Sequence, residues 1–201
     1  MNHPETALAY FMQGYNCAQA TAAAFAADFG LAPEAVLKMT AGFGGGMGGL
    51  RETCGAVSAM VYVAGLHAGH YDPGDTAAKK ALYDRVKELQ REFVAQYGTT
   101  CCRDLLLKAS CLPLPDPSER TAAYYAQRPC AHFVATAAAI LARKLRLPDD
   151  VGATLLEKGA PQTPSKTFCF ICGFRRQLSR GKARWEPLGR PAESAKGNKK
   201  V

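Results

Sequence analysis

The sequence has no apolar run long enough to cross a membrane. Its longest uncharged apolar stretches lie around Ala56–Leu66 and Phe133–Ala142, whereas a membrane-spanning helix needs about 20 such residues. The first ten residues, MNHPETALAY, also lack the basic and apolar regions of a signal peptide. We therefore expect a cytoplasmic protein, in a compartment that keeps thiols reduced.

β-Strand patterns and internal repeats are absent from the first 160 residues. Alanine-rich segments with apolar residues at three- and four-residue steps indicate helices instead. The expected fold class is all-α: a small helical bundle with a Gly-rich loop at Gly42–Gly49, followed by an irregular basic tail. The helix that begins at Cys54 is apolar nearly all round, so we expect it to be central and buried. Helices are predicted over residues 4–12, 17–28, 33–39, 54–66, 73–97, 101–108 and 129–145, with another short helix after Pro148.

The body of the chain has no excess of positive charge, although the whole chain does. Residues 1–162 carry 15 Lys and Arg against 15 Asp and Glu, whereas residues 163–201 carry 10 against 2. We therefore predict a helical domain over residues 1–160 and a basic, partly disordered tail over 161–201. Such a tail could bind an anionic partner such as nucleic acid. Because no folded DNA-binding motif accompanies the charge, a solvated tail is the favoured interpretation.

Eight cysteines need an explanation other than a disulfide framework, since a reducing compartment does not favour one. At the start of a helix, free N–H groups and the positive end of the helix dipole stabilise a thiolate and lower the cysteine pKa. Thiolate is the form that attacks disulfides and binds soft metals. The alternative is that these cysteines pack as small hydrophobic residues. Four of them fall at predicted helix starts: Cys17, Cys54, Cys102 and Cys130.

The Gly-rich loop directly precedes Cys54. Gly44, Gly46 and Gly49 permit close backbone approach, so the loop and the following helix start resemble an anion-binding nest. These three glycines are the candidate cofactor-binding residues. Their spacing also matches a dinucleotide fingerprint, which we reject because no strand precedes the loop. The structural alternative is a close helix crossing that only glycine permits.

Four cysteine-containing segments together carry a family resemblance. GYNCAQA contains Cys17, FGGGMGGLRETCGAVSA contains Cys54, CCRDLLL contains Cys102, and RPCAHFVATAAAIL contains Cys130. In these segments the chain resembles the C_GCAxxG_C_C family of redox-active proteins. The resemblance departs from the family pattern at Ala59, where the family has glycine. It implies that residues 1–160 form a redox domain that works through these four cysteines.

Several chemistries fit four thiols that meet in one site, and the sequence leaves them open. Pairs could cycle between dithiol and disulfide, as in a thiol oxidoreductase that exchanges electrons with a redox partner protein or a small thiol. The four thiolates could instead hold an iron–sulfur cluster or a zinc ion without turnover. In the first case we expect Cys17 and Cys54 to be the most reactive, with Cys102 and Cys130 as partners. A homo-oligomer is compatible with either chemistry.

Further candidates in the body carry weaker signals. Adjacent helix residues face different ways, so we expect Cys102 rather than Cys101 to enter the site. Cys111 could be a resolving thiol or a packing residue. Arg51 and Arg103 lie near candidate thiols in the sequence and could favour thiolate by their charge.

Histidines and the tail supply the remaining candidates. His67 and His70 are spaced to reach one metal ion, and His132 could be an acid–base partner for a thiol. The alternative is that His67 and His70 are polar surface residues and that His132 is an ordinary, partly buried histidine. In the tail, Cys169 and Cys172 form a CxxC, which is one half of a zinc site or a redox dithiol. A zinc site there would need two more ligands.

Overall fold

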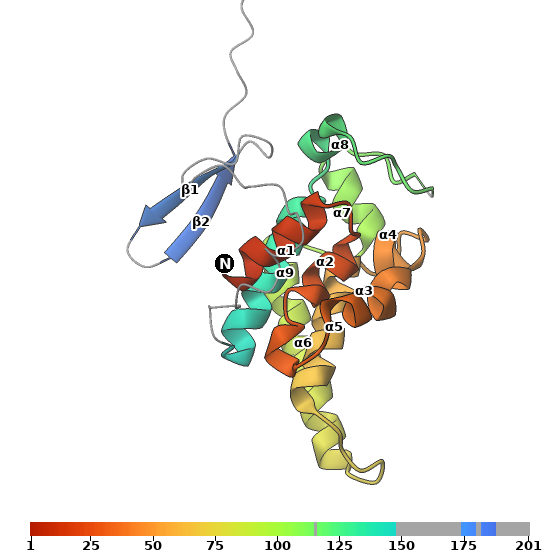
Figure 1. Cartoon of the computed structure of the whole chain (residues 1–201), viewed down its shortest axis with the longest axis vertical. Helices are drawn as coiled ribbons and strands as arrows, with labels where there is room; N and C mark the ends of the chain where they lie inside the picture. Colours follow the sequence, from red (N-terminus) through yellow and green to blue (C-terminus); the bar gives the residue numbers. More distant parts are fainter. Residues whose placement is uncertain (115, 148–173, 180–181, 188–201) are drawn as a thin grey trace, which may run out of the picture. The chain divides into compact units, whose positions relative to one another are not determined.

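Helices build the N-terminal part of the chain, as the sequence predicts. The computed structural model describes residues 1–114, 116–147, 174–179 and 182–187. The chain divides into two compact units, residues 1–160 and 161–201, and each is considered by itself. The helices of the first unit are α1 (His3–Met12), α2 (Cys17–Ala23), α3 (Pro33–Thr40), α4 (Gly44–Met47), α5 (Gly55–Ala68), α6 (Thr76–Tyr97), α7 (Cys102–Lys108), α8 (Ala122–Gln127) and α9 (Cys130–Leu145), with 3-10 turns at Ala27–Phe29 and Ala41–Phe43 (Figure 1).

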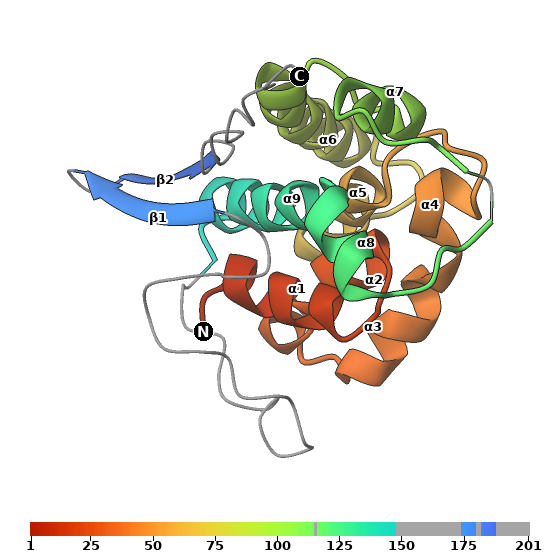
Figure 2. The ribbon, with the colours of Figure 1, turned by 90° about the horizontal axis from the view of Figure 1, so that it is seen from above.

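Helix α5 forms the centre of this unit, as expected from its apolar sequence. It packs against α2, α6 and α9, which surround it in Figure 2. Its first turns are buried, and Ala56, Val57 and Met60 have no exposed surface. Ala59, which stands where the family pattern has glycine, is also fully buried, so its methyl group is part of the core. Small residues on α5 let the neighbouring helices approach closely.

The helix that was expected over residues 17–28 is shorter than predicted. Helix α2 ends at Ala23, and the next amides donate to carbonyls three residues back, such as Phe25 N to Ala22 O at 3.1 Å. The chain tightens there into the Ala27–Phe29 turn, where Asp28 Oδ2 lies 2.8 Å from the buried His3 Nε2. This tertiary contact draws the chain back toward α1, and alanine periodicity alone does not reveal it.

Two other helix boundaries differ from prediction. Helix α6 begins at Thr76 rather than at Pro73, because the Asp75 side chain accepts a hydrogen bond from Ala78 N and caps it there. Helix α8 was not predicted; its cap is the Thr121 hydroxyl, which accepts from Tyr124 N. In the described residues, no helix is long and apolar enough to span a membrane.

The second unit contains a β-hairpin where an irregular tail was expected. Strands β1 (Phe174–Ser179) and β2 (Lys182–Pro187) pair antiparallel, with Phe174 opposite Pro187 and Ser179 opposite Lys182. A backbone ladder of this kind depends on pairing between strands, which basic composition does not reveal. The CxxC cysteines Cys169 and Cys172 and the short helix expected after Pro148 lie outside the described residues.

Candidate functional site

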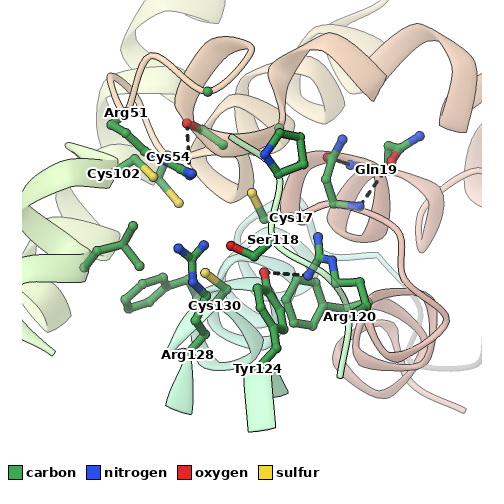
Figure 3. Close-up of a pocket in the computed structure, with 18 of the residues that line it drawn as sticks. Cys17, Gln19, Arg51, Cys54, Cys102, Ser118, Arg120, Tyr124, Arg128 and Cys130 are labelled. Atoms are coloured by element: carbon green, nitrogen blue, oxygen red, sulfur yellow. Dashed lines mark hydrogen bonds between the residues drawn. The ribbon is translucent and has the colours of Figure 1, made fainter. Parts of the chain in front are cut away.

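The fold brings four cysteines from distant parts of the first unit to one pocket. The pocket has a volume of about 540 Å³ and is lined by Cys17, Cys54, Cys102 and Cys130. Figure 3 shows their sulfur atoms turned toward a common space. All four are free thiols. They are therefore chemically available to one another and to a molecule that enters the pocket.

Each of these cysteines stands at the beginning of a helix, as predicted. Cys17 is the first residue of α2, behind Asn16, whose Oδ1 accepts hydrogen bonds from Ala18 N and Gln19 N at 3.0 Å. Cys54 immediately precedes α5. Cys102 and Cys130 are the first residues of α7 and α9.

A short backbone pairing holds Cys54 beside Cys102. Cys54 N donates to Thr100 O at 2.8 Å, and Cys102 N donates to Glu52 O at 2.6 Å. Cys102 lines the pocket, whereas Cys101 does not, and Cys101 Sγ instead lies 3.5 Å from Arg51 O. The alternation of side chains along an extended segment explains why only one of the two adjacent thiols enters the site.

The glycines around the pocket are required because other atoms lie where a side chain would be. A Cβ on Gly55 would stand 2.5 Å from Cys17 Sγ, and one on Gly46 would stand 2.8 Å from Cys102 Cβ. A Cβ on Gly44 would stand 2.5 Å from the Asn16 side chain. Of the three predicted cofactor-binding glycines, Gly44 and Gly49 line the pocket and Gly46 is buried behind it. The sequence predicts a close approach that only glycine permits. In the structure this approach is between the loop and the start of a helix rather than between two helices.

Cys17 is the thiol whose ionised form the pocket stabilises. Its pKa is lowered from 9.0 to about 6, chiefly by a hydrogen bond from the Cys54 thiol. Burial opposes this shift, while the backbone N–H groups of Gly45 and Gly55 and the charge of Arg120 support it. These contacts favour the thiolate form of Cys17 over the thiol.

Cys54 has the opposite protonation behaviour. Its pKa is raised well above 9.0, because its proton is held in the hydrogen bond to Cys17, because it is buried, and because a second negative charge beside Cys17 is unfavourable. The sequence placed Cys54 and Cys17 together as the most reactive thiols. In the structure the two differ: the pKa of Cys17 is lowered and that of Cys54 is raised.

The expectation that every helix start lowers a cysteine pKa is wrong for the other two thiols as well. Burial raises the pKa of Cys102, and it raises the pKa of Cys130 to about 12; the Cys17 charge contributes to both shifts. Loss of water around a buried thiolate disfavours the charged form at these positions. Burial thus favours the neutral thiol at both residues.

Three arginines share the pocket with the thiols: Arg51, Arg120 and Arg128. Arg51 was a sequence candidate; it is buried, its Nε donates to Leu114 O at 2.8 Å, and it hydrogen-bonds Cys102. The other two were missed: Arg128 lies two residues before Cys130, the same signal that singled out Arg51, whereas Arg120 is ten residues from Cys130 and carries no such signal. Arg103, the other sequence candidate, is 53% exposed and lies 3.9 Å from Glu52 instead.

The remaining candidates lie away from the pocket. His67 and His70 are exposed, and His132 is not a lining residue, although burial lowers its pKa. Cys111 is also outside the lining, and its Sγ lies 3.2 Å from Gln127 O. In the structure these residues do not act at the thiols directly.

Metal ligands are not clustered in the described part of the chain. Within it, no group of three or more His, Cys, Asp or Glu side chains is arranged so that it could hold one ion. Binding of zinc or an iron–sulfur cluster by the four thiols remains a sequence prediction.

A helical unit that brings four free thiols to one pocket fits a redox-active protein. The chain belongs to the C_GCAxxG_C_C family, whose model is described as "Putative redox-active protein" and matches residues 15–144. This segment contains all four pocket cysteines and the three arginines. Neither a search of curated proteins nor a search of solved structures found a match to the chain.

Proposed function

We propose that this protein is a thiol oxidoreductase in which Cys17 and Cys54 are the working dithiol. The observation that carries the proposal is the placing of two free thiols side by side in one pocket: Cys17 Sγ lies 2.5 Å from where a Cβ would stand on Gly55, the residue after Cys54. The lowered pKa of Cys17, to which Cys54 contributes most, supports it. Such a pair supplies both the ionised nucleophile and the second sulfur that disulfide exchange needs.

The first step is attack by Cys17 on a disulfide R–S–S–R. The Cys17–S bond forms, the substrate S–S bond breaks, and the departing thiolate takes the Cys54 proton to give R–SH. The largest cause that raises the Cys54 pKa is its hydrogen bond to Cys17; burial comes next and the Cys17 charge third. The mixed disulfide removes the first and the third. Cys54 therefore becomes easier to ionise when its thiolate is needed.

In the second step the Cys54 thiolate attacks Cys17 Sγ. The Cys17–Cys54 disulfide forms, the second substrate thiolate leaves, and it takes a proton from solvent. Two electrons have then passed from the protein dithiol to the substrate disulfide, which becomes two R–SH molecules. A small thiol or a redox partner protein would return the protein to the dithiol state by the reverse exchange.

Cys102 and Cys130 are proposed as partners that stay protonated during these steps. Their raised pKa values keep further negative charge out of the pocket while Cys17 reacts. Either could later exchange with the Cys17–Cys54 disulfide after losing its proton. The zinc half-site at Cys169 and Cys172 and nucleic-acid binding by the basic tail remain sequence predictions.

The test is to map the bond that forms when the reduced full chain meets one equivalent of hydroxyethyl disulfide without oxygen. After alkylation and digestion, mass spectrometry is expected to find a Cys17–Cys54 disulfide. In Cys54→Ser the reaction should stop at a mixed disulfide on Cys17. Cys101→Ser, whose thiol does not line the pocket, is the matched control and should react like the unaltered chain. Reduction of the disulfide by Cys17→Ser at the unaltered rate would refute the proposal.

A further inference from the structure

The charge of the pocket is unbalanced. Arg51, Arg120 and Arg128 line it, and among the described residues no Asp or Glu does. The only group in the lining whose charged form is negative and favoured is the Cys17 thiol, whose pKa is lowered. Three guanidinium groups and no carboxylate thus share the pocket, an arrangement that attracts negative charge.

Two of these arginines, Arg120 and Arg128, are held with open donors. Arg120 Nη1 donates to the Tyr124 hydroxyl at 2.6 Å, and its guanidinium lies over the Tyr124 ring, 4.5 Å from the centroid. Arg128 lies over the same ring at 5.2 Å and approaches Leu112 O at 3.4 Å. In the part of the chain that the structure describes, neither pairs with a carboxylate.

Tyr124 therefore acts as a platform that orients both guanidinium groups beside the thiols (Figure 3). Arginine held flat in this way retains donors that match the two oxygens of a carboxylate. The pocket volume of about 540 Å³ lies within the range of small-molecule sites. A ligand with a carboxylate near a disulfide sulfur would place the sulfur at Cys17 and the carboxylate at these arginines.

We infer that the pocket selects small disulfides that carry carboxylates, and that Arg120 and Arg128 bind those carboxylates. This inference rests on the proposed reaction at Cys17 and adds the substrate class to it. Arg51 has a different role, because its donors are already engaged with Leu114 O and Gly45 O. It ties these two segments together rather than binding substrate.

Three disulfides of similar size and different charge test the inference on the full chain: dithiodiglycolate, hydroxyethyl disulfide and cystamine, which are anionic, neutral and cationic. The rate constant for modification of Cys17 is measured with each and divided by the rate constant of the same disulfide with free 2-mercaptoethanol, which removes intrinsic reactivity. We expect the normalised rate to be highest for the anion and lowest for the cation.

Variants then assign the preference to particular residues. Arg120→Gln and Arg128→Gln should each lower the ratio of the anionic to the neutral rate about tenfold, the effect of losing one hydrogen bond to a charged group. The ratio is used because Arg120 also favours the Cys17 thiolate, and a change in thiolate fraction cancels in it. Arg120→Lys, which keeps the charge, should restore part of the ratio. Arg103→Gln removes an arginine outside the pocket and should leave the ratio unchanged.

The outcomes separate the two proposals. Equal normalised rates for the three disulfides, or an equal loss of ratio in Arg103→Gln, would overturn the carboxylate inference while the reaction at Cys17 stands. Failure of Cys17 to react with any of the three would overturn the proposed function, and the carboxylate inference with it.

Discussion

The hydrogen bond between Cys54 and Cys17 can be tested with two substitutions that differ in one property. Cys54→Ala removes the donor, whereas Cys54→Ser replaces it with a hydroxyl that can still donate. Because this bond is the largest cause of the low Cys17 pKa, about 6, the alanine variant should have a clearly higher Cys17 pKa. The serine variant should retain most of the shift.

The size of the effect follows from the energy of one hydrogen bond to a charged group, about 1.5–3 kcal/mol. At 1.36 kcal/mol for each pKa unit, its loss raises the Cys17 pKa by roughly 1–2 units. At pH 7 the thiolate fraction would then fall from about nine-tenths to between about a half and a tenth. The reaction of Cys17 with iodoacetamide should slow in the same proportion.

The assay is the pH dependence of that alkylation, followed at the Cys17 peptide by mass spectrometry so that the other thiols do not interfere. Circular dichroism of each variant checks that the helices remain. An unchanged midpoint in Cys54→Ala, or an equal rise in both variants, would show that Cys54 does not hold the Cys17 thiolate as argued.

Two further predictions concern the walls of the pocket. Gly55→Ala puts a methyl group where Cys17 Sγ lies. It should destabilise the protein by about 1–3 kcal/mol in urea unfolding and change the rate of Cys17 alkylation. Gly65→Ala, on the same helix with nothing within 4 Å of its new Cβ, should do neither. The free energy of unfolding should rise with pH between about 6 and 9, because the lowered Cys17 pKa means that the unfolded chain binds more protons in that interval. Above pH 9 the free energy of unfolding should fall again toward pH 12, because Cys130 then stays protonated only in the folded chain. Cys130→Ala should weaken that fall. A flat pH profile in the unaltered protein would contradict both pKa assignments.

The helix starts of the site could be predicted because local signals determine them. Asn16 caps α2 through its own side chain, and Pro129 sets the entry to α9, so Cys17 and Cys130 are placed by their immediate neighbours. The central position of α5 followed in the same way from its apolar sequence. These features need no knowledge of the rest of the fold.

The protonation of the thiols could not be predicted, because it depends on contacts between distant segments. The shifts of Cys17 and Cys54 arise from each other, although 36 residues separate them in the sequence. Arg120 is ten residues from Cys130 in the sequence, and its place over the Tyr124 ring depends on the tertiary fold. Local rules give a helix start its dipole, but burial and pairing then decide whether the dipole prevails.

The distribution of protons also bears on the choice between dithiol chemistry and a four-thiolate centre. Metal ligation requires deprotonated cysteines, so binding to all four would release the protons of Cys54, Cys102 and Cys130. The fold raises the pKa of each of these three, and thus opposes that release at neutral pH. Disulfide exchange needs one thiolate at a time and returns each proton to a leaving thiol. A pocket that stabilises one thiolate beside a protonated partner is therefore better matched to exchange than to ligation, which is the physical reason for placing the dithiol reaction first.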